Sequence, residues 1–455
     1  MKAKSVRMNL NYLNGKEPIL KPDLGHDFNK DIKNKNIRVY PAQMDTQSLG
    51  KLRVSVTSET GFRPIQNARV SVAISGDPTS VVEEFTTDDL GRTGEIELPT
   101  PPLEYSLDQN IFEQPYSNYT VRVSAEGFKN VEVDGTELLP DVTAIQPISM
   151  EEEPQTPGQQ LYVIPPHTLF GDYPPKIAEA EIKPVDGSGE IVLREVVIPE
   201  FVIVHDGPPS DSSASNYYIR YSDYIKNVAS SEIYATWPAA TITANVLAIM
   251  SFTLNRVFTE WYRNQGYNFT ITSSTAFDHK WMRGRNIYDT INTAVDQVFN
   301  NYLSRPNVLQ PILTQYCDGR NVSCPGWMTQ WGSKTLGDQG RSAIEILRNF
   351  YGANMYINSA DQVAGVPSSW PGANLTTGSR GDSVRQMQEQ LNAISRVYTA
   401  IPTIAVDGVF GPQTEAAVRA FQQVFGLPAN GIVDLPTWYR ISQLYVAVTR
   451  IAELN

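Results

Sequence analysis

The chain has 455 residues, of which 41% are hydrophobic and 19% charged, and its 49 acidic and 37 basic side chains give a formal net charge of −12. This composition fits a soluble globular protein with about three domains. The acidic balance and the lack of a basic run argue against nucleic acid as a partner. No stretch approaches the roughly 18 consecutive apolar residues of a membrane span, and residues 1–20 contain no apolar run of signal-peptide length.

The first 149 residues divide into a leader and a strand-rich region. Residues 1–45 are polar and irregular, which predicts a loosely held leader. Residues 46–149 contain segments in which apolar and polar residues alternate and Val, Ile and Thr are frequent, as expected of β-strands. The clearest of these segments are residues 52–59, 67–75, 93–99 and 119–128. The region is predicted to be a β-sandwich, and nothing in it suggests catalysis.

Residues 150–198 are predicted to be a linker followed by an extended segment. The first part, residues 150–165, is acidic and rich in Pro, Gln and Gly, which is typical of an exposed connection that a protease can reach. We expect the processing site there. Further Pro and Gly residues continue to residue 198, so this part is expected to run as extended chain onto the next domain.

The next region, residues 199–360, opens with two predicted helices joined by a short turn. The first is expected to begin at Ser222 or Asp223, because both are good N-capping residues. Four residues at helical spacing share one face, which is apolar except at its last position. These residues are Ile225, Val228, Ala229 and Glu232.

Glu232 is therefore a candidate general acid. Burial and the negative end of the helix dipole both disfavour its ionised form. A carboxyl that is still protonated near neutral pH can donate a proton to a glycosidic oxygen. The alternative interpretation is a structural glutamate paired with a basic residue elsewhere, and the helical pattern alone favours that alternative.

The second helix follows Pro238, which suits a first helical turn. Residues 241–263 are apolar on nearly every face, which is typical of a central buried helix. A strand at residues 269–274 and a helix at residues 289–303 are predicted after it.

Residues 312–340 are predicted to be a long loop rich in Gly, Trp, Gln and Asn. Long loops inside a domain are often functional, and aromatic and amide side chains together can line a sugar-binding cleft. A well-packed surface loop is an equally favoured alternative. The candidate substrate-binding residues are Trp237, Tyr316, Trp327, Gln330 and Trp331.

The chain's two cysteines, Cys317 and Cys324, lie in the same segment. They can form a small-loop disulfide or remain thiols, and the sequence leaves both possibilities open. No histidine is near them in the sequence, so we expect no metal site and no cofactor.

The C-terminal part consists of a second linker and a helical unit. Residues 361–378 are rich in Pro, Gly and Ser. Residues 379–455 contain amphipathic segments at the spacing of three helices, and two similar turns, at 407–411 and 430–434, each lead into a helix. We therefore predict a three-helix unit with an internal near-repeat.

This C-terminal unit resembles the peptidoglycan-binding type 1 module, which is a three-helix bundle. The resemblance implies that residues 379–455 bind peptidoglycan. The matching residues are Val384, Gln388, Leu391, Asp407, Gly408, Phe410, Gly411, Thr414, Ala417, Val418, Phe421, Gln422, Gly426, Leu427, Gly431, Thr437 and Trp438.

The helix pair resembles the sporulation stage II D family of peptidoglycan lytic transglycosylases. The matching residues are Tyr224, Val228, Glu232, Trp237, Pro238 and Ala248, and residues 326–347 resemble a second region of that family. The resemblance implies that Glu232 is the catalytic glutamate. Two departures stand out: Met250 occupies a position that is usually basic in the family, and residues 277–285 replace its Gln/Tyr signature.

The order of the regions resembles that of spore cortex-lytic enzyme precursors of the SleC type. This resemblance implies a multidomain α+β protein with an N-terminal β-sandwich prodomain, a central α+β transglycosylase domain at residues 199–360 and a C-terminal three-helix bundle. It also implies a zymogen that is deposited in the spore, outside or at the cortex. A subtilisin-like germination protease would cut it, and the lack of a signal peptide is compatible with this route.

The expected reaction is a non-hydrolytic cleavage of the MurNAc–GlcNAc β-1,4 bond that leaves a 1,6-anhydro-MurNAc end. One carboxyl suffices because the attacking hydroxyl belongs to the sugar itself. A hydrolase (muramidase) is the alternative, because a second carboxylate from Asp278, Asp289 or Asp318 could approach through folding. A non-catalytic wall-binding protein is the alternative from another class.

Overall fold

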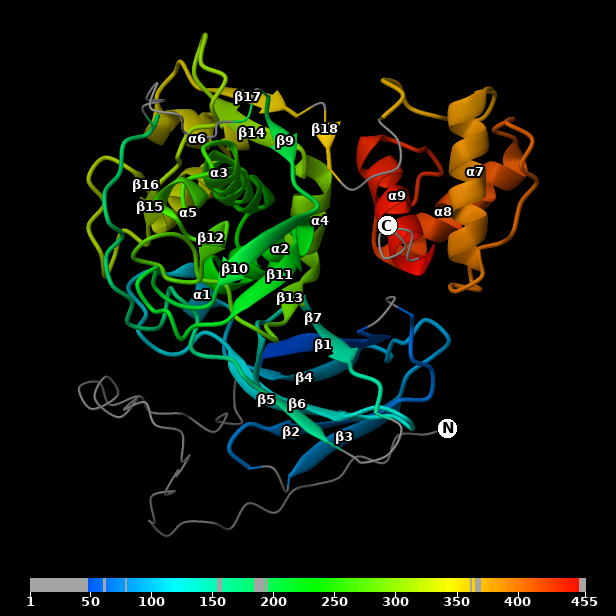
Figure 1. Cartoon of the computed structure of the whole chain (residues 1–455). Coiled ribbons are helices and arrows are strands. Elements are labelled where there is room, and N and C mark those ends of the chain that lie inside the picture. Colours follow the sequence, from blue (N-terminus) through cyan, green and yellow to red (C-terminus); the bar gives the residue numbers. More distant parts are fainter. Residues whose placement is uncertain are drawn as a thin grey trace. The chain divides into compact units, whose positions relative to one another are not determined.

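The computed structural model describes residues 48–59, 63–77, 80–153, 158–183, 193, 195–360, 362–364 and 370–449. The predicted leader and residues 154–157 of the predicted linker lie outside the described residues. Within the described part, the chain is a mixed α+β protein with nine α-helices and several sheets (Figure 1). The α+β class predicted from the sequence is therefore confirmed.

The N-terminal region consists of two β-sheets, ordered β13-β7-β1-β4 and β3-β2-β5-β6-β8. Alternate residues of β1, Leu52, Val54 and Val56, are at most 1% exposed and form part of the core. This alternation explains why the strand pattern was readable in the sequence. The strands of this region are β1 (Ser48–Ser58), β2 (Arg69–Ile74), β3 (Val81–Thr86), β4 (Ile96–Thr100), β5 (Ser117–Ser124), β6 (Asn130–Leu138), β7 (Thr143–Met150) and β8 (Gln159–Val163), with the short helix α1 (Glu104–Leu107) after β4.

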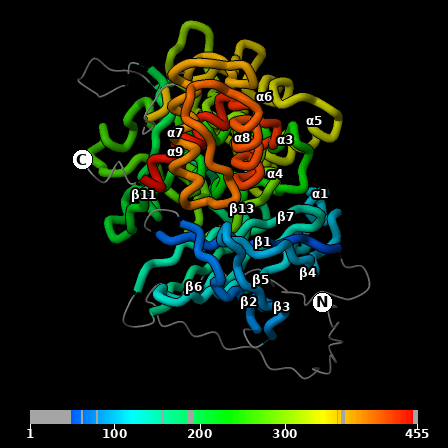
Figure 2. The backbone as a smooth tube through the Cα atoms, turned by 90° about the vertical axis from the view of Figure 1, so that its right-hand side faces the viewer, coloured from blue at the N-terminus to red at the C-terminus, as the bar shows by residue number. Residues whose placement is uncertain are grey.

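Two strands join these sheets from later parts of the chain. β8 comes from the segment predicted as linker and pairs in parallel with β6. β13 (Ile287–Tyr288) comes from the region predicted as catalytic and pairs antiparallel with β7, beside which it lies in Figures 1 and 2. No local pattern predicts either pairing, because each depends on a partner more than twenty residues away. The sandwich, defined here as residues 48–153 with β8, is thus completed by a strand of the following unit.

The unit that follows is built around α2 (Tyr221–Glu232) and α3 (Ala239–Phe258), with Pro238 as the N-cap residue of α3. Three further helices belong to it: α4 (Asp289–Val298), α5 (Gln330–Asp338) and α6 (Ala343–Tyr351). Its strands form the small sheets β11-β10-β12, β14-β17, β15-β16 and β18-β9. Their bounds are β9 (Val197–Ile198), β10 (Phe201–His205), β11 (Asn216–Arg220), β12 (Ile271–Thr272), β14 (Asn301–Ser304), β15 (Tyr316–Cys317), β16 (Met328–Thr329), β17 (Tyr356–Ser359) and β18 (Gln362–Val363).

Helix α3 is the core helix of this unit, as its all-round apolar pattern predicts. Among the described residues it is the one helix long and apolar enough to cross a membrane, with a mean hydropathy of 1.2 over an 18-residue window. However, 89% of that window is buried inside the protein. Core helices have the same length and composition, so the burial identifies α3 as a packing element that supports α2.

Several predictions in this unit are wrong in part. The N-cap residue of α2 is Arg220 rather than Ser222 or Asp223, and α3 ends at Phe258 rather than at residue 263. The helix predicted to continue to residue 303 ends at Val298, because Asn301 and the residues after it pair with β17. The long loop predicted at residues 312–340 contains helix α5, whose N-cap is Thr329. Gly337 obscured this helix in the sequence, yet it is needed there: a Cβ at this position would lie 2.0 Å from the hydroxyl oxygen of Thr241. The glycine lets α5 pack closely on α3.

The C-terminal unit is a three-helix bundle of α7 (Asp382–Ser395), α8 (Pro412–Phe425) and α9 (Leu435–Thr449). Its internal near-repeat has a structural basis in two buried glutamines. The amide nitrogen of Gln388 donates to the carboxylate of Asp407 and the carbonyl of Val409, and that of Gln422 donates to the side chain of Asn430 and the carbonyl of Ile432. Each glutamine therefore holds the turn that leads into the next helix.

Candidate active site

Glu232 is the last residue of α2, and its side chain is 3% exposed. Its neighbours on the apolar face, Ile225, Val228 and Ala229, are fully buried. The pattern that predicted one apolar stripe ending in an acid is therefore realised in the fold. The alternative, a structural ion pair, would require a basic side chain within about 4 Å, and no such pair with Glu232 occurs among the described residues.

Two donors hold the carboxylate of Glu232. The backbone N–H of Lys280 donates to Oε1 at 2.6 Å, and the hydroxyl of Tyr316 donates to Oε2. Burial raises the pKa of Glu232 above its ordinary value, while nearby Lys176 and the two hydrogen bonds oppose that rise. A carboxyl with a raised pKa and fixed geometry is suited to act as a general acid.

Glu232 lines a pocket with about 510 Å³ of empty space. All residues that line it come from positions 168–330, so none belongs to the sandwich. Besides Glu232, Thr275 and Gln330, two segments contribute. One is a strap, defined here as residues 166–183, which contributes Thr168, Gly171, Tyr173, Pro174 and Lys176; the other is a loop that contributes Tyr316, Cys317, Asp318, Asn321 and Val322.

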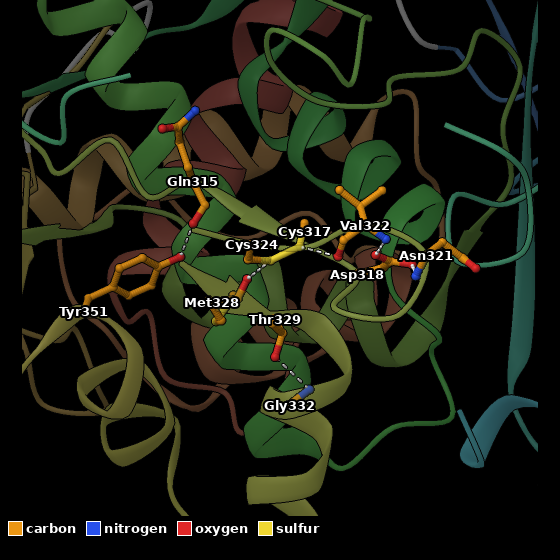
Figure 3. Close-up of a disulfide and its surroundings, with 10 residues drawn as sticks. All are labelled: Gln315, Cys317, Asp318, Asn321, Val322, Cys324, Met328, Thr329, Gly332 and Tyr351. Carbon is orange, nitrogen blue, oxygen red and sulfur yellow. Dashed lines mark hydrogen bonds between the residues drawn. A yellow bond between two sulfur atoms is a disulfide. The ribbon is translucent and has the colours of Figure 1, made fainter. Parts of the chain in front are cut away.

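A disulfide closes the loop at this pocket, between Cys317 and Cys324 (Figure 3). Inside the closed loop, the carboxylate of Asp318 accepts the backbone N–H groups of Asn321 and Val322 at 2.7 and 2.9 Å. The two possibilities that the sequence left open, disulfide or free thiols, are thus resolved in favour of the disulfide. It closes the loop that contributes Cys317, Asp318, Asn321 and Val322 to the pocket lining.

Two of the five predicted substrate-binding residues line the pocket. Tyr316 donates to Glu232, and the amide nitrogen of Gln330 donates to the backbone oxygen of Glu232 at 2.8 Å. Both therefore contact the candidate acid itself.

The three predicted tryptophans do not line the pocket. Trp237 and Trp331 are 3% and 4% exposed, and their ring centroids are 5.1 Å apart. The indole N–H of Trp237 donates to the backbone oxygen of Ser106 in α1, so this ring lies against the sandwich. Trp327 is partly buried. Their aromatic character suits packing as well as it suits sugar binding, and their contact with substrate stays a prediction.

The three candidate second carboxylates differ in their surroundings. Asp278 is fully buried and accepts from Arg256 and Tyr262, and Asp289 accepts the backbone N–H of Thr143 in the sandwich. Neither lines the pocket. Asp318 does line it. It is therefore the one of the three that shares the pocket with Glu232.

The segment 278–288 connects the pocket to the sandwich. Lys280 holds Glu232 through its backbone, and five residues later Arg285 forms a fully buried ion pair with Glu137 of β6, with an N···O distance of 2.7 Å. Asn286 exchanges hydrogen bonds of 3.0 and 2.9 Å with the backbone of Glu137. The sandwich therefore contacts the segment 278–288, and the same segment contains Lys280, whose backbone N–H donates to Glu232.

Sequence reasoning missed both Lys176 and Lys280. Lys280 lies in residues 277–285, and the sequence shows this stretch only as a departure from the Gln/Tyr signature of the family. Lys176 lies in a stretch that looked like featureless extended chain. Neither lysine belongs to a local sequence pattern. Lys280 contacts Glu232 through its backbone, and Lys176 approaches Glu232 through a contact that only the fold creates.

Comparison with known proteins identifies one region. Residues 380–441 match the family model described as a putative peptidoglycan binding domain. This match covers the predicted C-terminal module and confirms that part of the interpretation.

Similarity to whole proteins is limited to short regions. A spore cortex-lytic enzyme of Bacillus cereus is 32% identical over 107 residues, which are 24% of this chain and 37% of the relative. A zinc D-Ala-D-Ala carboxypeptidase of Streptomyces albus G is 41% identical over 76 residues, or 17% of this chain and 28% of that protein. The chain thus spans well under half the length of these relatives.

Among solved structures, the SleB N-terminal domain matches 16% of this chain and 93% of its own, with 33% identity and a TM-score of 0.14. The family match and the alignment with the Bacillus cereus enzyme show a peptidoglycan-binding domain and homology to a spore cortex-lytic enzyme over part of the chain.

Proposed function

We propose that the chain is a peptidoglycan lytic transglycosylase that acts on spore cortex glycan during germination and is made as an inactive precursor. The observation that carries the proposal is the buried Glu232 carboxyl, held by Tyr316 and Lys280 at a pocket. The peptidoglycan-binding match at residues 380–441 and the homology to spore cortex-lytic enzymes support the substrate class.

In the proposed reaction, Glu232 acts first as acid and then as base. Its proton passes to the oxygen of the glycosidic bond as that bond breaks. The resulting carboxylate then accepts the proton of the MurNAc 6-hydroxyl while the hydroxyl oxygen attacks C1, which gives a 1,6-anhydro ring. One carboxyl can perform both steps because the nucleophile belongs to the same sugar and has a high effective concentration.

A muramidase remains the second candidate because of Asp318. This carboxylate lines the same pocket, and a hydrolase needs a second carboxylate to activate water or to act as nucleophile. Against this role, both Asp318 oxygens already accept backbone N–H groups of its own loop. That arrangement favours a structural role for Asp318 in shaping the pocket wall.

The precursor part of the proposal rests on the sandwich. It does not line the pocket, so it would act on the segment 278–288 rather than by filling the site. A cut by a subtilisin-like protease within the predicted linker, residues 150–165, would break the chain between β7 and the strap. Because β8 pairs with β6, such a cut leaves the noncovalent contacts of the sandwich in place. Activation would then consist of the cut followed by separation of the sandwich.

Mass analysis of the ends of digested cortex glycan tests the reaction. We expect 1,6-anhydro-MurNAc ends from the active chain and no product from Glu232→Gln. Reducing MurNAc ends that disappear in Asp318→Asn would establish the muramidase instead. Binding of cortex fragments without any new glycan ends, by both the intact and the cut chain, would leave only the non-catalytic wall-binding protein.

A further inference from the structure

The strap brings a cation to the candidate acid. Among the residues that line the pocket, Lys176 is the one with a basic side chain. Its ammonium nitrogen lies 5.0 Å from the ring centroid of Tyr316 and 4.9 Å from that of Phe252 on α3, and it donates to the backbone oxygen of Asp278. Lys176 therefore lies next to the tyrosine that holds Glu232.

Helix α3 supplies no such cation at the pocket. Met250 is fully buried, and the other basic residue near Lys176, Arg256, is occupied by Asp278 and Glu179 with N···O distances of 2.7 and 2.6 Å. The backbone of Lys280 contacts Glu232, while its ammonium group lies over the ring of Tyr173. Lys176 is thus the cation whose placement depends on the strap alone.

The strap is built into the unit that carries Glu232. The backbone N–H of Ile177 donates to Ala276 at 2.6 Å, and that of Leu313 donates to Glu181 at 2.9 Å. The side-chain amide of Gln315 bonds the strap in both directions, accepting from Glu179 at 2.9 Å and donating to Ile177 at 2.6 Å. These contacts do not involve the sandwich.

The N-terminal end of the strap is held by the same unit. Thr168 donates through both its backbone and its hydroxyl to the carbonyl of Ser231, the residue before Glu232, at 3.1 and 3.0 Å. Only a few residues earlier, β8 belongs to the sandwich. The sandwich also contacts the first residues of the strap: the hydroxyl of Tyr116 accepts the backbone N–H of His167 at 3.2 Å, and its ring packs edge-on against Phe170. The contacts given above for Ile177, Glu179 and Glu181, further along the strap, are all with the unit that carries Glu232.

We propose that Lys176 is a positioning residue for Glu232, and that the strap remains part of the active enzyme after the linker is cut. The inference rests on the proposed function of Glu232. When the acid has given up its proton, a carboxylate is left in a buried pocket, where ionisation is costly without a nearby cation. The ammonium of Lys176 stabilises that carboxylate through Tyr316 until the carboxylate takes up the proton of the 6-hydroxyl.

The expected pH dependence follows from the sign of this interaction. Lys176 lowers the pKa of Glu232, whereas burial raises it. Because the reaction starts from protonated Glu232, activity falls as pH rises through that pKa. Loss of the ammonium therefore shifts the alkaline limb of the rate profile to higher pH. The charged and titratable groups that face Lys176 and Glu232 are Tyr173, Glu179, Tyr224, Arg256, Asp278, His279, Lys280 and Tyr316.

The test compares Lys176→Met, which keeps the length of the side chain, with Lys176→Arg, which keeps the charge. Arg341→Met is the matched control, because Arg341 is exposed and its one ion pair among the described residues is with Glu345 of α6. Each variant is assayed in the form, intact or cut within residues 150–165, in which the unmodified chain is active. We expect Lys176→Met to lower kcat by about 10- to 100-fold with little change in KM, as for a group that acts on the charge of the acid. Its alkaline limb should move to higher pH.

Lys176→Arg should recover most of the rate, and Arg341→Met should behave as the unmodified chain. Unchanged kcat and an unchanged alkaline limb in Lys176→Met would overturn the inference, as would an active product that mass analysis shows to lack residues 167–183. These outcomes differ from failure of the proposed function, in which Glu232→Gln keeps full activity or the unmodified chain is inactive in both forms.

Discussion

Two buried ion clusters lie at the two ends of the segment 278–285, and they differ in where their partners come from. At one end, Arg256 pairs with Asp278 and Glu179, and all three residues belong to the unit that carries Glu232. At the other end, Arg285 pairs with Glu137 of the sandwich. Between them, Lys280 donates to Glu232.

Because the two clusters differ in this way, separation of the sandwich would affect only one end of the segment 278–285. The Asp278 end stays anchored whether or not the sandwich is present, whereas the Arg285 end loses its anion. A guanidinium that loses its buried partner is unfavourable by several kcal/mol, so the segment is expected to rearrange. The sandwich can therefore influence Glu232 through Lys280 without lining the pocket.

The largest effect is expected from breaking the internal cluster. Arg256→Met leaves Asp278 without its cation and leaves Glu179 with Lys183 as its cation, and removing one partner of a buried pair typically costs about 3–5 kcal/mol. Urea unfolding should show a loss of this size in the intact and the cut chain alike, and the cut chain should lose its activity. Arg263 is an exposed arginine paired with the partly buried Glu260, and Arg263→Met should change stability by less than about 1 kcal/mol. Equal effects from the two variants would refute the importance of the cluster.

Breaking the cluster between the two regions should have a different signature. Glu137→Gln leaves Arg285 buried without its anion, at a cost of up to about 3–5 kcal/mol to the sandwich contact. We expect the sandwich to separate more readily from the cut chain in size-exclusion chromatography, and activity to rise rather than fall. The double variant Glu137→Leu with Arg285→Met should restore much of the contact, because two apolar residues leave no unpaired charge. Slower activation in Glu137→Gln would contradict the comparison.

The sequence predicted those parts of the molecule that are encoded locally. The strands of the sandwich follow from alternation such as that of Leu52, Val54 and Val56, and the burial of Glu232 follows from helical spacing within α2. The peptidoglycan-binding module was identified from turns and helices close together in the chain, and the match at residues 380–441 confirms it.

The remaining parts depend on contacts between distant segments. Glu137 is one of the acids of an alternating strand in the sequence, and only the fold shows it fully buried against Arg285. β13 is two residues long and has no strand signal of its own. Lys176 lies 56 residues before Glu232 in extended chain, so no periodicity connects them. Physical reasoning on a single sequence has no means of pairing such residues.

The disulfide of the pocket loop offers a further way to sharpen the comparison. Replacing both Cys317 and Cys324 by Ser removes a short cross-link whose loss is expected to cost about 2–3 kcal/mol. Both the intact and the cut chain should lose this stability, unlike Glu137→Gln. Activity should fall because Asn321 and Val322 line the pocket from within the closed loop. Thermal unfolding with and without reductant measures the stability that the disulfide contributes. A Tm of the unmodified chain that does not change with reductant would contradict the prediction.

The smallest expected effect is on the pH dependence of the free energy of unfolding, to which the buried Glu232 carboxyl contributes. Because burial raises its pKa above the ordinary value of 4.5, the folded state holds the proton more tightly than the unfolded state. Stability contributed by the protonated form is therefore lost as pH rises from about 4.5 through the raised pKa. Glu232→Gln cannot ionise, so its stability relative to the unmodified chain should increase between pH 5 and pH 8.

Glu345→Gln provides a control of opposite sign for this pH effect. Hydrogen bonds from Ser342 in the capping box of α6 lower the pKa of Glu345, so its contribution is present at neutral pH and is lost as pH falls. Its variant should therefore be relatively less stable at neutral pH, and the difference should shrink on acidification. Urea unfolding at several pH values separates the two cases. A Glu232→Gln difference that stays constant with pH would show that folding does not raise the pKa of the Glu232 carboxyl, and would weaken its assignment as the proton donor.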